Sequence, residues 1–354
     1  REQARVGMRS AAARVARRLP APLPESLRSW QQAPPAPQEI DPVELAELRQ
    51  QISDQLDSVL ELHQDAPGFV VYPPSIGWGV TLFQRPQQMA LAFARLGYVV
   101  LYNLNWGNPE GVRGFREYEP RLYLSSVPDQ LLDLYRRVAE PIFISYVYNF
   151  GWHEHLERPI KVYEHIDDLE VFTHAYDHRD LTGWHEVASR ESDVPVASAV
   201  DLHTELLGSR PDAVRVPNGV DFRHFAAARA HSAVPEDIAD LVESGRPIIG
   251  YYGAIAEWMD YDLVEYAAQS LPDYQFLFIG PDYDGSALRT RAFQLPNVRW
   301  LGPRDYGDLP DYLAQFDVAT IPFVVNDVTH RVSPLKLFEY MAGGKPIVTP
   351  ALRE

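Results

Sequence analysis

Lys336 and Glu339, near the end of the sequence, have the spacing of neighbours on one face of a helix. The preceding Ser333 is a favourable N-cap and Pro334 fits the first helical position, so we expect the helix to start there. A helix N-terminus attracts phosphate groups. With a cation and a carboxylate beside it, the segment suits a nucleotide diphosphate. On spacing alone, an ion pair on a solvated helix is the more common arrangement.

The residues that follow make the sequence more specific. The string Glu-Tyr-Met-Ala-Gly-Gly-Lys-Pro-Ile-Val at 339–348 resembles the nucleotide-sugar signature of retaining glycosyltransferases of family 4 and related families with the two-domain GT-B fold. The resemblance implies that Glu339 binds the ribose hydroxyls. From the residues themselves, we expect Lys336 and the helix end at Ser333 to hold the diphosphate. Many members carry a second glutamate eight residues earlier, where this sequence has Arg331. A cation there could pair with phosphate or with an acidic sugar.

Two adjacent carboxylates, Asp167 and Asp168, directly follow an apolar run that is typical of a strand. In that position one can act as a general base and the other as an N-cap. Related glycosyltransferases often carry an acidic pair here, so the resemblance implies a catalytic role for this one. The structural alternative is that both aspartates cap or orient the following helix.

The loop Gly77-Trp78-Gly79 lies between a predicted strand and a predicted helix, as in dinucleotide-binding folds. The third glycine of that fingerprint would fall at Leu82, and the next strand ends in asparagines instead of an acid, so NAD binding is disfavoured. In the glycosyltransferase interpretation this loop lines the cleft below the donor phosphates and the acceptor. Arg85 is a candidate for binding an anionic acceptor or the diphosphate, unless it is a surface cation at a helix start.

The second half of the chain offers further donor-site candidates. Gly253 ends a strand in small residues, where phosphates could approach backbone N–H groups. The family commonly places an Arg and a Lys after this strand, but residues 256–260 read Ala-Glu-Trp-Met-Asp. Lys336 and Arg331 are therefore the expected replacements. Arg304 follows another strand, at a turn where the resemblance places the nucleotide base, although turn chemistry alone also explains it.

The loop at 149–155 has two alternative functions. Its His-Glu-His triplet lacks the four-residue histidine spacing of a metalloprotease zinc site, so we expect no metal site there. The resemblance likewise implies metal-independent chemistry without a cofactor. Asn149 and Trp152 are instead expected to shape the acceptor pocket.

These candidates must be positioned by strands and helices that alternate along the chain. In the first half, a helix is expected at Arg85–Leu96 and strands at 68–73, 98–102, 142–146, 161–164 and 194–197. In the second half, strands are expected at 247–252, 275–279, 298–301, 318–322 and 347–349, with helices at 259–270, 287–293 and 309–315. The alternation predicts an α/β fold with two Rossmann-like, doubly wound parallel-sheet domains facing across a cleft.

The string Pro-Asn-Gly-Val-Asp at 217–221 resembles the domain junction of GT-B enzymes. We therefore expect an acceptor domain at 66–217 and a nucleotide-sugar domain at 218–354. Residues 1–65 precede them as a basic helix, a proline-rich linker and an amphipathic or coiled helix. The helix at 43–63 could form an oligomer or pack on the body, and the basic segment could contact anionic lipid or be a solvated linker.

Composition limits the classes of function. A chain of 354 residues exceeds the ~250–300 residues that one core usually serves, which also favours two domains. The net charge of −17 argues against nucleic-acid binding. The absence of cysteine excludes disulfides and thiolate metal sites. No apolar run approaches the ~20 residues of a membrane span, so we expect a cytoplasmic protein, with contact at the inner membrane face as an alternative.

Two details indicate an excerpt from a longer polypeptide. The sequence starts without methionine, and it stops just after a predicted strand that would still need covering helices. In GT-B enzymes the C-terminal segment crosses back onto the first domain. We therefore expect the second domain to be truncated.

Together these features predict a glycosyltransferase of cell-surface polysaccharide synthesis, retaining by resemblance. It would move a sugar from a nucleotide-diphosphate donor, UDP-linked in preference to GDP-linked, to a hydroxyl of a glycan or lipid-linked acceptor. Two other functions fit the same fold. One is a nucleotide-sugar epimerase, which needs no acceptor. The other is a non-catalytic nucleotide-sugar-binding or scaffold domain.

Overall fold

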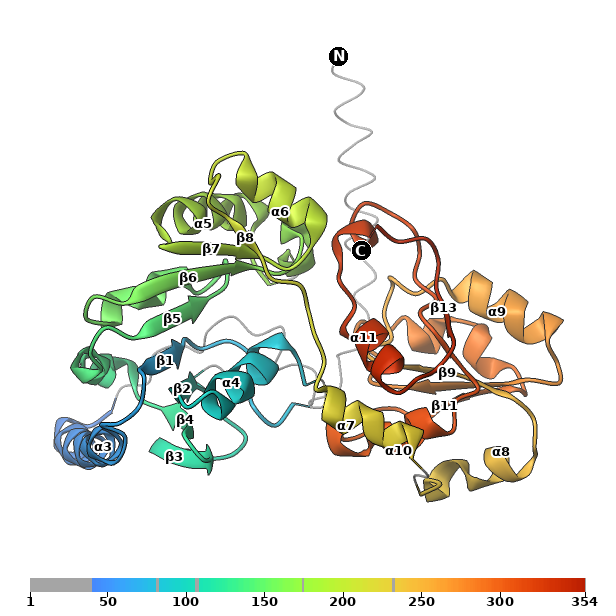
Figure 1. Ribbon diagram of the computed structural model, residues 1–354, viewed down its shortest axis with the longest axis horizontal. Coiled ribbons are helices and arrows are strands. Elements are labelled where there is room, and N and C mark those ends of the chain that lie inside the picture. Colours follow the sequence, from blue (N-terminus) through green and yellow to red (C-terminus); the bar gives the residue numbers. More distant parts are fainter. Residues whose placement is uncertain (1–39, 81–82, 106–107, 174, 231–232, 354) are drawn as a thin grey trace, which may run out of the picture.

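The computed structural model describes residues 40–353, except 81–82, 106–107, 174 and 231–232 (Figure 1). The predicted basic helix and nearly all of the predicted proline-rich linker lie outside these residues. The described chain forms two α/β bodies, each built on its own sheet. In Figure 1 the blue to green elements form one body, and the orange to red elements form the other.

Eight strands of the described chain form the first sheet, in the order β3-β4-β2-β1-β5-β6-β7-β8. Only β3 runs antiparallel to its neighbour. This hairpin of β3 and β4 was not predicted, because the charges of β3 hide its strand period. The strand bounds are β1 Phe69–Tyr72, β2 Val99–Asn103, β3 Gly114–Glu119, β4 Leu122–Ser126, β5 Ile142–Ser145, β6 Ile160–His165, β7 Val194–Ala197 and β8 Val214–Arg215.

Helices cover this sheet because its parallel strands are apolar on both faces. The long helix α3 is capped by Asp41, and it buries Ile52, Leu56 and Val59 in the same cluster as Val71 and Phe143. This helix was expected either to form an oligomer or to pack on the body, and the structure shows that it packs on the body. The helices are α3 Pro42–Leu62, α4 Arg85–Arg95, η1 Asp129–Arg137, η2 Phe150–His155, η3 Leu169–Phe172, α5 His178–Glu191 and α6 Val200–Leu207.

The second sheet has five parallel strands in the described residues, in the order β11-β10-β9-β12-β13. Their bounds are β9 Ile248–Tyr252, β10 Gln275–Ile279, β11 Val298–Trp300, β12 Val318–Thr320 and β13 Ile347–Val348. The two sheets confirm the predicted fold class. The domain junction expected at residue 218 lies between β8 and the first helix of the second body, and it stays a prediction.

The helices of the second body are α7 Phe222–Ala226, η4 Ala227–Arg229, η5 Glu236–Ile238, α8 Ala239–Glu243, α9 Tyr261–Ser270, η6 Ala287–Arg289, η7 Ala292–Gln294, η8 Tyr306–Asp308, α10 Leu309–Ala314, η9 Thr329–Arg331 and α11 Leu335–Ala342. The helix predicted at 287–293 is wrong, because two separate 3-10 turns occupy that segment. Thr290 between the two turns is extended, with φ of −86° and ψ of 151°, so a continuous helix cannot form.

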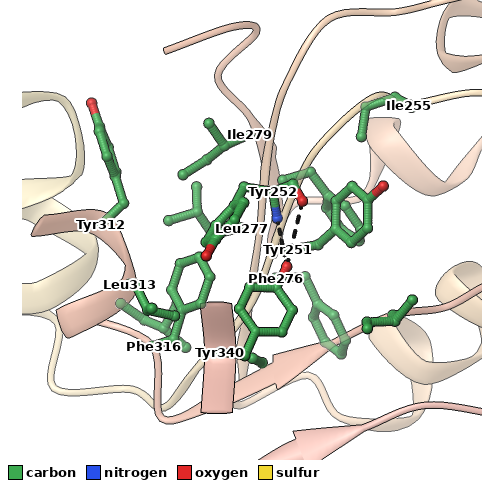
Figure 2. Packing of buried hydrophobic residues seen from close by; sticks show 14 of the residues in the cluster. Tyr251, Tyr252, Ile255, Phe276, Leu277, Ile279, Tyr312, Leu313, Phe316 and Tyr340 are labelled. Carbon is green, nitrogen blue, oxygen red and sulfur yellow. Dashed lines mark hydrogen bonds between the residues drawn. The ribbon is translucent and has the colours of Figure 1, made fainter. Parts of the chain in front are cut away.

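Helix α11 carries Lys336 and Glu339. It starts one residue later than predicted: Pro334 is the N-cap, and Ser333 makes no capping bond. The helix ends as expected, since Gly344 adopts the left-handed conformation with φ of 72°. Tyr340 fixes the helix to the sheet, because its hydroxyl accepts a hydrogen bond of 3.0 Å from the Tyr252 N–H of β9 (Figure 2).

Candidate functional site

A cavity of about 1290 Å³ lies between the two bodies and is lined by residues of both. Strands β1 and β6 of the first sheet and β9 and β10 of the second point their carboxyl ends toward it, which is where parallel α/β sheets bind ligands. Eight of the predicted site residues line the cavity: Gly77, Arg85, Asp167, Gly253, Arg304, Ser333, Lys336 and Glu339. The remaining predicted site residues do not line it: Trp78, Gly79, Asn149, Trp152, Asp168 and Arg331.

Two glycines let the second wall of the cavity form. Gly253 has φ of 134°, and a Cβ there would lie 2.6 Å from Cε of Lys336. Gly280, just after β10, has φ of 143°, and a Cβ there would lie 1.8 Å from the carbonyl oxygen of Gly253. Any side chain at either position would displace the lysine or the loop. These glycines therefore allow the lysine to approach the strand ends.

Lys336 and Glu339 both face the cavity from α11. The Lys336 Nζ lies 5.4 Å from the ring centroid of Tyr251 and 5.1 Å from that of Phe323, and it forms no salt bridge with any described carboxylate. Burial lowers the pKa of Lys336 to about 8 and raises the pKa of Glu339 to about 7. The solvated-helix alternative is therefore wrong. Glu339 shares a hydrogen bond with the Tyr252 side chain. The remaining hydrogen-bonding capacity of these two desolvated groups is available to a ligand.

The two aspartates after β6 have different surroundings. Asp167 lines the cavity, and burial together with the neighbouring Asp168 charge raises the pKa of its carboxyl to about 7, against the opposing effect of Arg85. Asp168 does not line the cavity. Its carboxylate accepts a 3.0 Å hydrogen bond from the Glu170 N–H and caps η3. The capping role is thus that of Asp168, and Asp167 is the carboxyl group available for chemistry.

Arg331 does not line the cavity, which corrects its expected place beside the phosphates. Its Nη1 donates to Oδ2 of Asp168 at 2.8 Å and to Oε2 of Glu205 at 3.1 Å. The cation therefore bridges two carboxylates of the first body. Arg331 therefore makes a contact between the two bodies.

Arg85 was expected to bind an anion or to be a surface cation, and it is neither exposed nor free. Only 6% of the residue is exposed, and its Nη2 lies 2.7 Å from Oε1 of Glu164 on β6. Its Nη1 donates to the Asn218 side chain and to the Pro217 carbonyl. Although it lines the cavity, this guanidinium already has protein partners.

Four predicted site residues in the glycine loop and in the loop after β5 make their contacts within the first body: Trp78, Gly79, Asn149 and Trp152. Trp78 is buried against Tyr102, and Gly79 donates its N–H to Glu110, so neither lines the cavity. The acceptor-pocket prediction for Asn149 and Trp152 is also corrected. The Asn149 side chain bonds backbone groups of Tyr146 and Pro74, and Trp152 stacks on Phe143 in the first core. Both residues follow the end of a strand, where ligand-binding residues are common, but their side chains pack into the interior of the first body.

Arg304 lies at the cavity and holds the loop after β11. Its Nη2 pairs with Asp237 Oδ2 at 2.6 Å, and its Nη1 donates to the carbonyl of Leu301. These contacts support the alternative that Arg304 stabilises the turn. A nucleotide base beside it would meet a guanidinium already fixed by the protein.

Histidines cluster elsewhere than in the His-Glu-His triplet. Within the described residues, His165, His185 and Glu205 offer ligand atoms within 4.8 Å of one another, whereas residues 153–155 form no such group. The Glu205 carboxylate of this cluster is already bound to Arg331. His185 Nδ1 contacts the Tyr163 hydroxyl at 2.7 Å. Arg331, which binds Glu205 of this cluster, also binds Asp168, so the cluster lies next to that aspartate.

Aromatic residues that the sequence argument did not single out complete the first wall. Tyr148, Phe172 and Tyr176 line the cavity and contact one another, with Tyr148 and Tyr176 stacked at 5.8 Å. Across the junction, Phe83 packs on Tyr306 at 5.2 Å. The sequence feature that could have indicated this wall is the occurrence of Phe172 and Tyr176 within a few positions after the acidic pair.

Two facing Rossmann-like sheets with a ligand-sized cavity between them define the GT-B fold, whose members include the glycosyltransferases similar to this chain. Residues 246–353 match the family described as "Glycosyl transferases group 1". This match confirms the resemblance for residues 246–353, and the structural neighbours confirm the fold. No helix in the described part of the chain is long and apolar enough to cross a membrane.

Among known proteins, the chain is similar to TuaH of Bacillus subtilis, named as a teichuronic acid biosynthesis glycosyltransferase. The two are 32% identical over 164 residues, which cover 45% of this chain and 40% of TuaH. The fold is similar to that of sucrose-phosphate synthase from Thermosynechococcus elongatus, with a TM-score of 0.55, 13% identity and coverage of 80% and 81%. It is also similar to HepE of Anabaena in complex with UDP and glucose, with a TM-score of 0.52, 17% identity and 80% coverage of each chain.

Proposed function

We propose that this protein is a glycosyltransferase of cell-surface polysaccharide synthesis. It transfers a sugar from a nucleoside-diphosphate donor, preferably a UDP-sugar, to a hydroxyl of a glycan or lipid-linked acceptor. The observation that carries the proposal is the shared cavity, where Lys336 and Glu339 of one body face the same space as Asp167 of the other. The family match of residues 246–353 and the naming of TuaH support the same class of reaction.

The donor lies against α11. Glu339 accepts hydrogen bonds from the ribose hydroxyls, because its buried carboxylate has little competing solvation. Lys336 and the start of α11 stabilise the diphosphate as it leaves with negative charge. Gly253 and Gly280 let the phosphates approach backbone N–H groups without a Cβ in the way. HepE in complex with UDP offers a parallel for the choice of nucleotide.

The acceptor lies against the first body. Asp167, whose raised pKa of about 7 is close to neutrality, orients or deprotonates the acceptor hydroxyl. If the sugar keeps its configuration, attack and departure share one face, and the leaving phosphate itself takes the proton. In that case Asp167 orients the hydroxyl. The aromatic wall of Tyr148, Phe172 and Tyr176 offers apolar faces to sugar rings.

The first experiment compares UDP, GDP, ADP, CMP and TDP as ligands by thermal shift, since a ligand that binds only the folded state raises its melting temperature. We expect UDP to stabilise the protein most. A labelled UDP-sugar is then incubated with and without a lipid-linked oligosaccharide extract. Acceptor-dependent transfer supports the proposal. Donor isomerisation without acceptor would identify an epimerase instead, and nucleotide binding without any turnover would identify a binding domain.

A further inference from the structure

We propose that Arg85 and Asn218 are positioning residues that set the distance between the donor helix α11 and the strand that carries Asp167. This inference rests on the proposed function, because it assigns roles to the two sides of that site. The observation behind it is a continuous polar connection from Glu164 on β6 through Arg85 and Asn218 to Ser333. Below, this connection is called the polar relay.

The first link of the polar relay is the buried pair of Arg85 and Glu164. The Nη2 to Oε1 distance is 2.7 Å, and the Arg85 Nε also donates to both carboxylate oxygens at 3.2 and 3.3 Å. The side chains are 7% and 4% exposed. Charged groups at this depth hold a fixed geometry, because leaving either one unpaired is strongly unfavourable.

The second link uses both ends of one amide. Arg85 Nη1 donates to Oδ1 of Asn218 at 3.2 Å, while Nδ2 of Asn218 donates to the carbonyl oxygen of Ser333 at 2.7 Å. Asn218 lies in the segment that joins the two bodies. An amide is the side chain that can accept on one side and donate on the other at this position. The relay therefore crosses the interdomain segment through side chains.

The two ends of the relay lie close to the reacting groups in sequence. Glu164 precedes Asp167 by three residues, and Ser333 precedes Lys336 by three and Glu339 by six. Glu164 itself does not line the cavity. Since one end is fixed to β6 and the other to the start of α11, the relay determines how far the acceptor aspartate lies from the diphosphate site. A transfer reaction is sensitive to that separation.

Other contacts between the two bodies lack this combination. Arg95 pairs with Asp221 at 2.9 Å, but its side chain is 58% exposed. Arg331 pairs with Asp168 at 2.8 Å, with 36% of the arginine side chain exposed. Exposed pairs are screened and flexible. The relay is the buried connection whose two ends flank the proposed catalytic groups.

The decisive variant is Asn218→Asp, which keeps the acceptor for Arg85 and replaces the donor to Ser333 by a carboxylate oxygen. Hydrogen exchange is measured on the free protein, so the readout does not depend on any reaction. Losing one hydrogen bond at the helix start is expected to speed amide exchange in residues 333–339 by about five-fold. Arg95→Gln, the matched control at another interdomain pair, should leave these amides unchanged. Unchanged exchange in Asn218→Asp would overturn the inference.

A second measurement uses Glu164→Gln, because Glu164 has no contact with the cavity and cannot bind substrate directly. In a folded variant, UDP affinity should change less than about two-fold, whereas kcat of transfer should fall about ten-fold or more. Combining it with Asn218→Asp should give less than the product of the two losses, since both break one relay. Equal kcat in wild type and variants would overturn the positioning role. Absence of transfer by the wild type would instead overturn the proposed function, and the exchange result would stand.

Discussion

The two walls of the cavity use their charged residues differently. On the first wall, Arg85 pairs with Glu164 and Glu170 pairs with His178, whereas Asp167 faces the cavity with no salt bridge to a described residue. On the second wall, Glu339 is buried and Lys336 is partly buried, and neither makes a salt bridge with a described residue. Burying charges that no ion pair neutralises is unfavourable for stability. The difference indicates that the second wall is built around a charged ligand, and that the first mainly holds a framework for one functional carboxyl.

The largest effect is expected for a substitution of Asp167 on the first wall. Asp167→Asn should lower kcat of transfer by at least ~10²-fold with little change in UDP affinity, because it removes the group that orients or deprotonates the acceptor. Steady-state kinetics and nucleotide titration measure the two effects. Asp168→Asn is the matched control and should retain most activity. Equal losses in both variants would mean that the pair acts as one unit.

The same carboxyl predicts a pH dependence. Since the pKa of Asp167 is raised to about 7 by burial, its ionised form dominates only above that pH, and transfer should slow as the pH falls below about 7. For stability the sign is opposite. The folded state holds this proton more tightly than the unfolded chain, whose aspartate pKa is about 3.9, so stability from this group declines as pH rises from about 4 to 7. Asp167→Asn should reduce both dependences in rate and denaturation profiles, and the part that remains comes from Glu339, whose pKa is also raised to about 7.

On the second wall, Glu339→Ala should weaken UDP binding about 10- to 100-fold through loss of charge-assisted hydrogen bonds to ribose. The free energy of unfolding should stay equal or increase, because a buried carboxylate has been removed. Calorimetric titration and denaturant unfolding distinguish the two effects. Glu243→Ala, an exposed glutamate at the end of α8, is the control. Unchanged UDP affinity in Glu339→Ala would reject this assignment.

Lys336→Met should weaken UDP binding about 10-fold and leave uridine binding nearly unchanged, since in the proposed function the lysine contacts the diphosphate and not the nucleoside. The methionine keeps the apolar stem between Tyr251 and Phe323. The measurement is a comparison of the two titrations at low and high salt. If both ligands lose affinity equally, the effect comes from packing.

The smallest effect is expected for the exposed interdomain pair. Arg331→Gln removes the contacts to Asp168 and Glu205 and should lower the free energy of unfolding by about 0.5 kcal/mol, because partly exposed pairs are screened. UDP affinity should not change, since Arg331 does not line the cavity. A clear loss of UDP binding would return Arg331 to the donor site.

The sequence predicted the fold well, and it placed Lys336 and Glu339 on one helix, because both features depend on local patterns. Residues 333–348 contain the helix, its glycine end and both charged residues in one continuous stretch. The first wall depends on contacts between distant residues. Arg85 and Glu164 are separated by 79 positions, so no local pattern could reveal that the arginine is already paired. Asn149 and Trp152 follow a strand end as predicted, but the direction of their side chains is set by the core.

Helix α3 contributes to the first core as well as covering it. It supplies Ile52, Leu56 and Val59, and the Gln55 side chain accepts a hydrogen bond from the Phe115 N–H at the β3 edge. A fragment that begins after residue 62 would expose this apolar face and leave that edge uncovered. Such a fragment should be prone to aggregation. An excised acceptor domain therefore needs to begin at or before Asp41, the residue that caps the helix.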